Sequence, residues 1–459
     1  MLILINAVGL TPRLLEYAPR LKALAEAGWA MPVRDIVPSV TMSAQATILT
    51  GTNVDHHGIV GNGWLFRNTN EVRFWQQSNA LLQVEPFYAI ARKRAAQRKR
   101  KFKSAKLFWW FNQGADVDIS ITPKPHYGVD GNKVFGVSGN PEFFAQSMED
   151  RIGKFPFHTF WGPKAGLPCT QWIARAAAET VTVELPDLTM VYLPHLDYDP
   201  QRYGPSGCDM PKLVKQLDDA CAPLLDAAKN AGADVWVVSE YGHCDVKTPV
   251  YLNRVLREAD YLSVRYGPFG EQLETFTSRA FAVVDHQLAH VYVRNPNDIK
   301  PVKELIAGLT GVARVFEGEE RADIHLNHTR AGDLVVLSER DSWFAYPFWQ
   351  DDERAPDYAR AVAIHHKPGY DPAELFFDPK LMFPMARMAR KLIQKKLGFR
   401  TIFDVVPLDA SIVKGSHGLI ADDPQDGPLI IANGPEPSGN ILPLTAFKDL
   451  LLQKMGLPD

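Results

Sequence analysis

The chain has 459 residues, a formal net charge of -3 at pH 7, and apolar and charged contents of 46% and 22%. These values are typical of a globular protein, and the length suits one α/β core with insertions. The charge excludes a global electrostatic case for binding nucleic acid or a membrane.

Signals for disulfide bonds and for export are weak in this sequence. The four cysteines form no CxxC pair and are too sparse for a disulfide framework, so we expect reduced thiols in a cytoplasmic protein. The first apolar run is too short for a signal peptide, and no stretch is long enough to span a bilayer.

The chain opens on the apolar run 2–5, which is typical of a buried parallel strand and ends at Asn6. The segment 38–64 then holds Thr41, at or just before a predicted helix over 44–50, and a glycine-rich loop that ends at Asn62. Free amides and the helix dipole favour an anionic ligand at such a helix start. Taken alone, Thr41 is more simply interpreted as an N-cap residue.

The segment 92–106 is strongly basic. A solvated helix face before a strand is the favoured interpretation, because no aromatic residues interleave with the charges as in many RNA-binding segments. The run 107–111 then predicts a buried strand or a pocket wall, and aromatic residues near positions 64, 75, 109 and 160 either line a cleft or belong to the core.

Polar residues follow two further predicted strands. The strand over 187–193 precedes Asp197 and Gln201, with His195 and Asp199 as neighbouring alternatives. After a helix over 210–230, the strand over 235–238 leads to Glu240 and Tyr241, and two more polar residues, His243 and Asp245, follow as substitutes. Open α/β sheets place their sites just past such strand ends.

The C-terminal half is less regular. After a helix over 252–259, the segment from 261 to about 400 loses the α/β alternation, and within it Asp285 and His286 precede a strand over 290–293. His365, His366 and Lys367 add cationic groups that suit an anionic substrate. His417 lies in a histidine-glycine pair, and the segment 428–433 returns as a strand.

Four short motifs occur in a fixed order along the chain. They are PSVT followed by TG, HGI and Asn62; Asp197 to Gly204-Pro205; SEYG at 239–242; and the His417-Gly418 pair. In this pattern the chain resembles the alkaline phosphatase superfamily, within it the nucleotide pyrophosphatase/phosphodiesterase and phosphonoacetate hydrolase branch. The Arg330, Gly332 and Asp333 turn also resembles a family turn, which we interpret as structural.

The resemblance implies an α/β fold, an alkaline-phosphatase-like three-layer α/β/α sandwich with a mostly parallel central sheet and an inserted cap. It implies a core of residues 1–259 and 400–459 and a cap of residues 260–399. The implied nucleophile is Thr41, and Asn62 holds a phosphoryl oxygen. Asp285 and His286 are the implied substrate contacts, with a structural role as the alternative. The implied metal-ligand positions are Asn6, Thr41, Asp197, Gln201, Glu240, Tyr241 and His417.

These ligand positions depart from the family pattern of three aspartates, three histidines and the threonine, which holds two zinc ions. Two carboxylates and one imidazole remain here. Two dications 4 Å apart repel by on the order of 16 kcal/mol at an effective dielectric constant of 20, so they need anionic ligands. We therefore expect one well-held divalent metal (Zn, Mn or Mg) and a second that is weak or arrives with the substrate.

The resulting expectation is a metal-dependent hydrolase of a phosphate mono- or diester or a phosphonate, acting through a threonine nucleophile. A metal-depleted binding protein of the same fold and a phosphotransferase or mutase are the alternatives. The expected partner is a small phosphorylated or phosphonate substrate, with no nucleic acid and no membrane, and the oligomeric state stays open.

Overall fold

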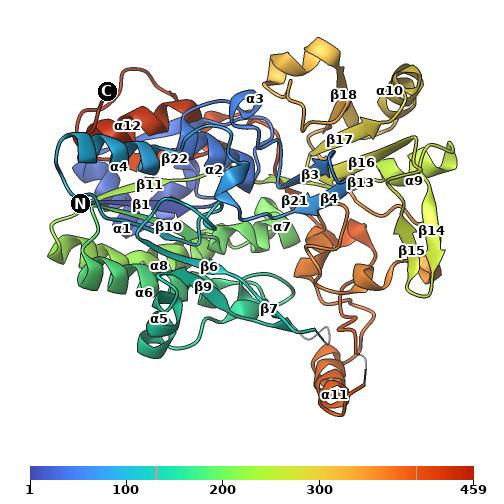
Figure 1. The fold of residues 1–459 in the computed structure, drawn as a ribbon, viewed down its shortest axis with the longest axis horizontal. Helices are drawn as coiled ribbons and strands as arrows, with labels where there is room; N and C mark the ends of the chain where they lie inside the picture. The colour runs from blue at the N-terminus through green and yellow to red at the C-terminus, as the bar shows by residue number, and fades with distance from the viewer. Residues whose placement is uncertain (130–132, 400) are drawn as a thin grey trace.

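The computed structural model describes residues 1–129, 133–399 and 401–459, and within them a nine-stranded sheet forms the centre of the molecule (Figure 1). Five of the eight strand pairings are parallel, and three are antiparallel. Across the sheet the strands are β23 (Leu442–Pro443), β2 (Trp29–Arg34), β22 (Leu429–Ala432), β11 (Asp234–Val238), β1 (Leu2–Ala7), β10 (Leu188–Leu193), β5 (Ser104–Leu107), β6 (Ile119–Pro123) and β9 (Val137–Asn140).

The middle of the sheet is the most deeply buried part. Strand β1 pairs in parallel with β10 on one side and β11 on the other, and every residue of β1 and β10 is buried. A strand covered on both faces is apolar at nearly every position, and these two segments are apolar except for Asn6 and Thr189. The predicted α/β fold with a mostly parallel sheet is confirmed.

Helices cover both faces of this sheet, which gives the molecule its three layers (Figure 1). One face carries α1 (Pro19–Ala27), α6 (Leu167–Glu184) and α8 (Met210–Asn230), and the other carries α2 (Thr41–Thr50), α4 (Phe87–Gln97) and α12 (Phe447–Lys454). Helix α2 is buried along its whole length and ends at Gly51, whose φ of 66° is a left-handed conformation that glycine adopts without strain.

A second sheet lies beside the first. It consists of β16 (Ala280–Asp285), β17 (Leu288–Val293), β19 (Leu334–Ser338) and β18 (Val312–Glu317), all antiparallel. Helices α9 (Leu252–Glu258) and α10 (Ile299–Ala307) pack on it and share its own hydrophobic cluster. The division into a core and a cap stays a prediction, and its boundary residue Arg400 lies outside the described residues.

The remaining elements connect these sheets. They are α3 (Val54–His57), α5 (Phe144–Ile152), α7 (Asp199–Tyr203), α11 (Pro384–Lys396), and the strand pairs β3 (Gly63–Phe66) with β4 (Glu71–Phe74), β7 (His126–Tyr127) with β8 (Lys133–Val134), β12 (Cys244–Asp245) with β21 (Gly415–Ser416), β13 (Thr248–Val250) with β20 (Ser342–Phe344), and β14 (Val264–Gly267) with β15 (Gly270–Leu273). All four cysteines are free. Within the described part of the chain, no helix is both long and apolar enough to cross a bilayer.

Two local expectations need correction. The predicted strand over 107–111 ends at Leu107, because Phe108 and Phe111 have φ values of 63° and 59° and leave the extended conformation. The basic segment 92–106 is not solvated throughout, since Lys106 on β5 is wholly buried and donates from Nζ to the carbonyl of Phe111 at 2.9 Å. The rest of that segment contains the end of α4 and the loop before β5, as predicted.

Candidate functional site

The carboxyl ends of the three central strands converge on one buried site. Asn6 lies near the end of β1, Asp197 follows β10, and Glu240 follows β11. Parallel strands that lie side by side end at the same edge, so residues distant in the sequence meet there. Their side chains are almost fully enclosed, with 0% of Asn6, 8% of Asp197 and 0% of Glu240 exposed.

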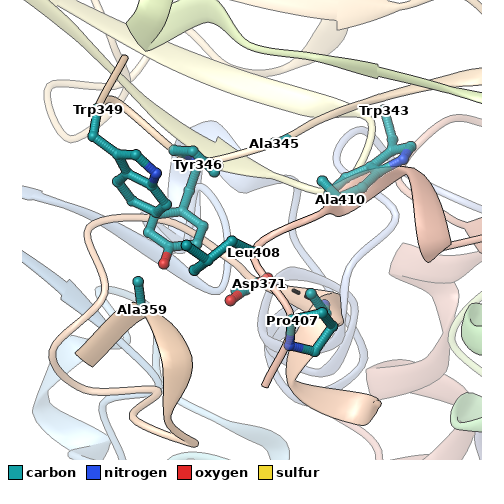
Figure 2. Close-up of a pocket in the computed structure, with 11 residues that line it drawn as sticks. Trp343, Ala345, Tyr346, Trp349, Ala359, Asp371, Pro407, Leu408 and Ala410 are labelled. Atoms are coloured by element: carbon teal, nitrogen blue, oxygen red, sulfur yellow. Dashed lines mark hydrogen bonds between the residues drawn. The ribbon is translucent and has the colours of Figure 1, made fainter. Parts of the chain in front are cut away.

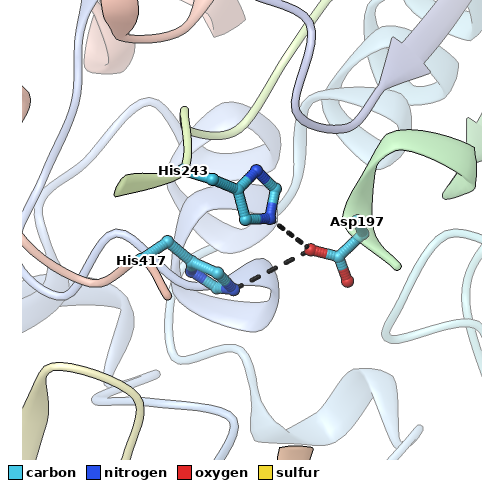
Figure 3. A group of neighbouring side chains, drawn as sticks. All are labelled: Asp197, His243 and His417. Carbon is cyan, nitrogen blue, oxygen red and sulfur yellow. Dashed lines mark hydrogen bonds and ion pairs between the residues drawn. The ribbon is translucent and has the colours of Figure 1, made fainter. Parts of the chain in front are cut away.

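Asp197 forms a compact cluster with two histidines (Figure 3). His243 Nε2 lies 3.1 Å from Asp197 Oδ1, and His417 Nε2 lies 3.9 Å from the same oxygen. One donor atom from each residue lies within 4.8 Å of the other two. A carboxylate with two imidazoles is a donor set for a divalent metal such as zinc, and three protein ligands leave a coordination position open.

The orientation of His417 suits a ligand role. Its Nδ1 contacts the carbonyl oxygen of Ser39 at 2.7 Å, so Nδ1 carries the proton and Nε2 presents its lone pair to the cluster. Nε2 is buried without a hydrogen-bond partner among the described residues. Burial lowers the pKa of His417 well below its usual range, which keeps the imidazole neutral and able to bind a metal. The residues present therefore fit one metal.

The other half of the site is organised by amide hydrogen bonds. Glu240 Oε1 accepts from Asn6 Nδ2 at 2.5 Å and from Gln45 Nε2 at 2.7 Å. Glu240 Oε2 and Asn6 Oδ1 have no hydrogen-bond partner in the part of the chain that the structure describes, so two oxygen donors remain for a hard cation. Burial raises the pKa of Glu240 to about 8, and a cation bound there must compete with a proton at neutral pH. These residues suit a second metal poorly.

Thr41 is the first residue of α2 and is 3% exposed. Its Oγ1 lies 2.9 Å from the Tyr241 hydroxyl, which donates to Asp197 Oδ1 at 3.2 Å. The single phenol proton is directed to Asp197, so Thr41 donates to Tyr241. Tyr241 thus links the predicted nucleophile to the metal-ligand cluster, and its ring stacks on His417 with centroids 3.8 Å apart.

Asn62, 20 residues after Met42 in the sequence, accepts a hydrogen bond at the start of α2. Its Oδ1 accepts from the backbone amide of Met42 at 3.0 Å, and its Nδ2 donates to Asp285 Oδ1 at 3.1 Å. The backbone amide of Asn62 also donates to Asp285, at 2.6 Å. Asp285 therefore fixes the position of Asn62 beside Thr41, and the contacts of its carboxylate are with protein groups.

The tip of the β16–β17 hairpin carries His286 into the same site. His286 has a φ of 60°, an uncommon conformation for a non-glycine residue, and its Nδ1 contacts Asp285 at 2.7 Å. The ring lies between those of His417 and Tyr370, each with centroids 3.8 Å away. Within residues 1–129, 133–399 and 401–459, the Nε2 atom of His286 is buried without a hydrogen-bond partner. Gln201 contacts the same Tyr370, accepting from its hydroxyl at 2.5 Å.

Other polar residues that the sequence suggested lie outside this constellation. His195 contacts Gln216, Asp199 pairs with Arg202, and Asp245 accepts from Ser206. Lys367 is buried between Asp371 and Glu374, each at 2.7 Å, so its charge is already compensated within the protein. These residues therefore act in local structure rather than at the site.

His243 is the residue that sequence reasoning underrated. It lies two positions after Tyr241, so pattern matching at fixed spacing passes over it. The chain turns at Gly242, where a Cβ atom would lie 1.8 Å from the carbonyl oxygen of Asp426. Only glycine fits this approach, and the turn lets Tyr241 and His243 both reach Asp197. The sequence signal for His243 is its place two positions after Tyr241, where the family pattern has a histidine ligand.

Two hollows among the described residues lie apart from this site. A cavity lined by Trp343, Tyr346, Asp371 and Leu408 has about 10 Å³ of space, room for little more than one water molecule (Figure 2). An open groove of about 520 Å³ is lined by Arg73, Arg265, His365 and other residues, with the acidic Glu71 and Glu274 among them.

Comparisons with known proteins identify the family of this chain. The profile of the family described as type I phosphodiesterase/nucleotide pyrophosphatase matches residues 2–371. Ectonucleotide pyrophosphatase/phosphodiesterase family member 7 of Rattus norvegicus is 24% identical over 297 residues, which are 60% of this chain and 59% of the relative. Family member 1 of Rattus norvegicus is 23% identical over 247 residues, 51% of this chain and 23% of the relative.

Solved structures share the fold. Murine ectonucleotide pyrophosphatase/phosphodiesterase 5 superimposes with a TM-score of 0.59 at 15% identity, covering 99% of this chain and 95% of that one. Phosphonoacetate hydrolase from Sinorhizobium meliloti 1021, in complex with phosphonoformate, superimposes with a TM-score of 0.61 at 15% identity. The match again covers 99% of this chain and 95% of that one. The chain has the alkaline-phosphatase-like fold, and it belongs to the type I phosphodiesterase/nucleotide pyrophosphatase family.

Proposed function

We propose that this protein is a metal-dependent hydrolase of a phosphate ester or a phosphonate, with Thr41 as the nucleophile. The observation that carries the proposal is one continuous buried network. It runs from the Thr41 hydroxyl through Tyr241 to Asp197, the shared partner of His243 and His417. Family membership and the solved relative bound to phosphonoformate support the same chemistry.

Asp197, His243 and His417 are the residues that would hold a divalent metal. When bound, such an ion supplies Lewis-acid polarisation of a phosphoryl oxygen and lowers the pKa of a nearby hydroxyl. Asn6 and Glu240 would offer their unpartnered oxygens to a second, weaker ion, with the Tyr241 oxygen beside them. Gln201 would bring no charge to a ligand position. One well-held ion is therefore expected.

The chain's own groups perform the remaining steps. Thr41 passes its hydroxyl proton to Tyr241 as Tyr241 passes its own to Asp197. Thr41 Oγ1 attacks phosphorus in line, and the Thr41–phosphorus bond forms as the bond to the leaving group breaks and the leaving group departs with the bonding electron pair. The second N–H of the Asn62 side-chain amide, beside the one that donates to Asp285, and backbone amides at the start of α2 other than that of Met42 hold the equatorial oxygens as negative charge develops on them. Asp285 keeps Asn62 in place. His286 presents its free Nε2 to the substrate. Water then hydrolyses the phosphothreonine.

The test replaces Thr41 with alanine and uses Ser43→Ala as the matched control, because Ser43 is also a buried hydroxyl on α2 but bonds to the carbonyl of Ile59. We expect Thr41→Ala to lower kcat by more than about a thousandfold, with metal content unchanged, and Ser43→Ala to stay within a few-fold. Turnover of phosphate esters and phosphonates and metal content by plasma mass spectrometry are measured on both. Activity retained by Thr41→Ala would rule out the nucleophile assignment.

The neutral residues at Asn6, Gln201 and Tyr241 favour a second candidate, a binding protein that has lost catalysis. That candidate predicts ligand binding with no turnover and no stoichiometric metal in the wild-type protein. Transfer of labelled phosphate to an acceptor other than water would instead indicate a phosphotransferase.

A further inference from the structure

Helix α11 projects from the body of the molecule at the lower edge of Figure 1. It has 13 residues and no buried one. Its apolar side chains are strongly exposed, with Leu392 at 50%, Ile393 at 59% and Leu397 at 69%. The flanking residues Phe383 and Phe399 are exposed at 70% and 65%. Several large apolar side chains exposed on and beside one short helix are typical of an interaction site.

The charged and apolar sides of α11 face the opposite way from those of an ordinary surface helix, which turns its apolar side to the protein. Its inner side carries Arg387 and Lys391, which both pair with Asp404, and Met388, which packs against a small cluster containing Val405. Its outer side carries the exposed apolar residues. A helix that uses charged groups to attach to its own protein leaves its apolar face for something else.

The charge around this face identifies the partner. Between Asp378 and Asp404 the sequence has seven lysine and arginine residues and no acidic residue. Arg390 and Lys396 are exposed on the helix itself, next to its apolar side chains. A basic helix with an apolar face is the pattern that lies in the interface of an anionic membrane. A second copy of the chain fits less well, since paired α11 helices would bring like charges together.

We propose that α11 and its flanks, residues 382–399, dock this protein onto an anionic phospholipid surface. At 1.5 Å per residue the helix is about 20 Å long, too short to span a bilayer core of about 30 Å, so it lies in the interface. The apolar side chains enter the acyl boundary while the cations contact lipid phosphates. The near-neutral charge of the whole chain hides this segment, which is why composition predicted no membrane partner.

The test is co-sedimentation of the full chain with vesicles of phosphatidylcholine alone and of phosphatidylcholine with about 30% phosphatidylserine. We expect binding to the anionic vesicles that weakens when salt is raised from about 0.1 M to about 0.5 M. Leu392→Ser/Ile393→Ser and Arg390→Ala/Lys396→Ala should each weaken binding by at least about tenfold. Hydrolysis of a soluble substrate should not change in either variant.

Matched controls lie on the core. Val183→Ser/Leu185→Ser removes two exposed apolar side chains, and Lys212→Ala/Lys229→Ala removes two exposed cations, all far along the chain from α11. The controls should bind as the wild type does. Equal binding to both vesicle types, absence of binding to either, or equal losses in the controls would each overturn the proposal. So would a dimer in sedimentation velocity that Leu392→Ser/Ile393→Ser dissociates, because a second copy would then cover the face.

Discussion

Two halves of one buried site differ in how their polar groups are satisfied. In the half built from Asp197, His243 and His417, a carboxylate and two imidazoles converge, and His417 Nε2 has no hydrogen-bond partner among the described residues. In the half built from Asn6 and Glu240, amide groups already occupy one carboxylate oxygen, and burial raises the pKa of Glu240 to about 8. The first half therefore offers stronger donors to a cation than the two unpartnered oxygens of the second, and metal binding should differ between them.

The largest effect should follow removal of His243. We expect His243→Ala to weaken metal binding by at least about a hundredfold and to lower activity in parallel, because it removes one of three converging donors. Titration calorimetry with zinc and manganese measures the loss. His195→Ala is the matched control, since His195 follows the same strand as Asp197 but contacts Gln216. Equal metal affinity in His243→Ala and the wild type would contradict the assignment.

A smaller loss of activity should follow from removing a hydrogen-bond partner of Asn62 while keeping Asn62 itself. Asp285→Asn replaces an acceptor of two Asn62 groups. We expect kcat to fall by about tenfold to a hundredfold, less than the hundredfold to thousandfold typical of losing a donor to a developing oxyanion. Metal affinity should be unchanged, because Asp285 contacts none of the three donors in the proposed metal site. A loss of metal together with activity would assign Asp285 to the metal site instead.

The weaker half can be rebuilt. Asn6→Asp/Tyr241→His restores a carboxylate and an imidazole beside Glu240, so we expect affinity for a second divalent ion to rise by about tenfold or more and the metal-to-protein ratio to move from about one toward two. Metal analysis after dialysis reports the ratio. A ratio already near two in the wild-type protein would show that the amide-bonded half binds a cation unaided.

The smallest effect concerns stability and pH. Burial raises the pKa of Glu240 to about 8, so the folded state keeps a proton that the unfolded state releases above its lower pKa. Stability therefore falls as pH rises from about 4.5 to about 8, by about 1 kcal/mol per unit. Glu240→Gln keeps the amide contacts and should flatten this slope in urea unfolding.

Asp35 provides the comparison for that measurement. Burial raises its pKa to about 6, so Asp35→Asn should flatten the slope only below about that pH. Identical pH profiles in the wild type and Glu240→Gln would mean that Glu240 is ionised and held by a cation across the range.

Local patterns were sufficient for several elements of this fold. An apolar run predicted β1 as a buried parallel strand, strands were predicted at β10 and β11, and helix α8 was placed with its observed ends. The failures arose where the backbone leaves regular conformations, as at Phe108 and Phe111, or where a charged side chain is buried, as at Lys106. Neither feature follows from periodicity, because periodicity reports neither the φ angle of a single residue nor the hydrogen bond that lets a lysine be buried.

The sequence by itself determined the order of the motifs and the polar residues at the ends of the strands, because strand ends and their spacing are properties of the local chain. Only the tertiary structure decided that His243 joins Asp197 and His417, that Tyr241 contacts Thr41, and that Asp285 holds Asn62. The hydrogen bond between Asn62 and Asp285 joins residues 223 positions apart. Such contacts depend on how the chain folds at the edge of the sheet, and no spacing along the sequence predicts them.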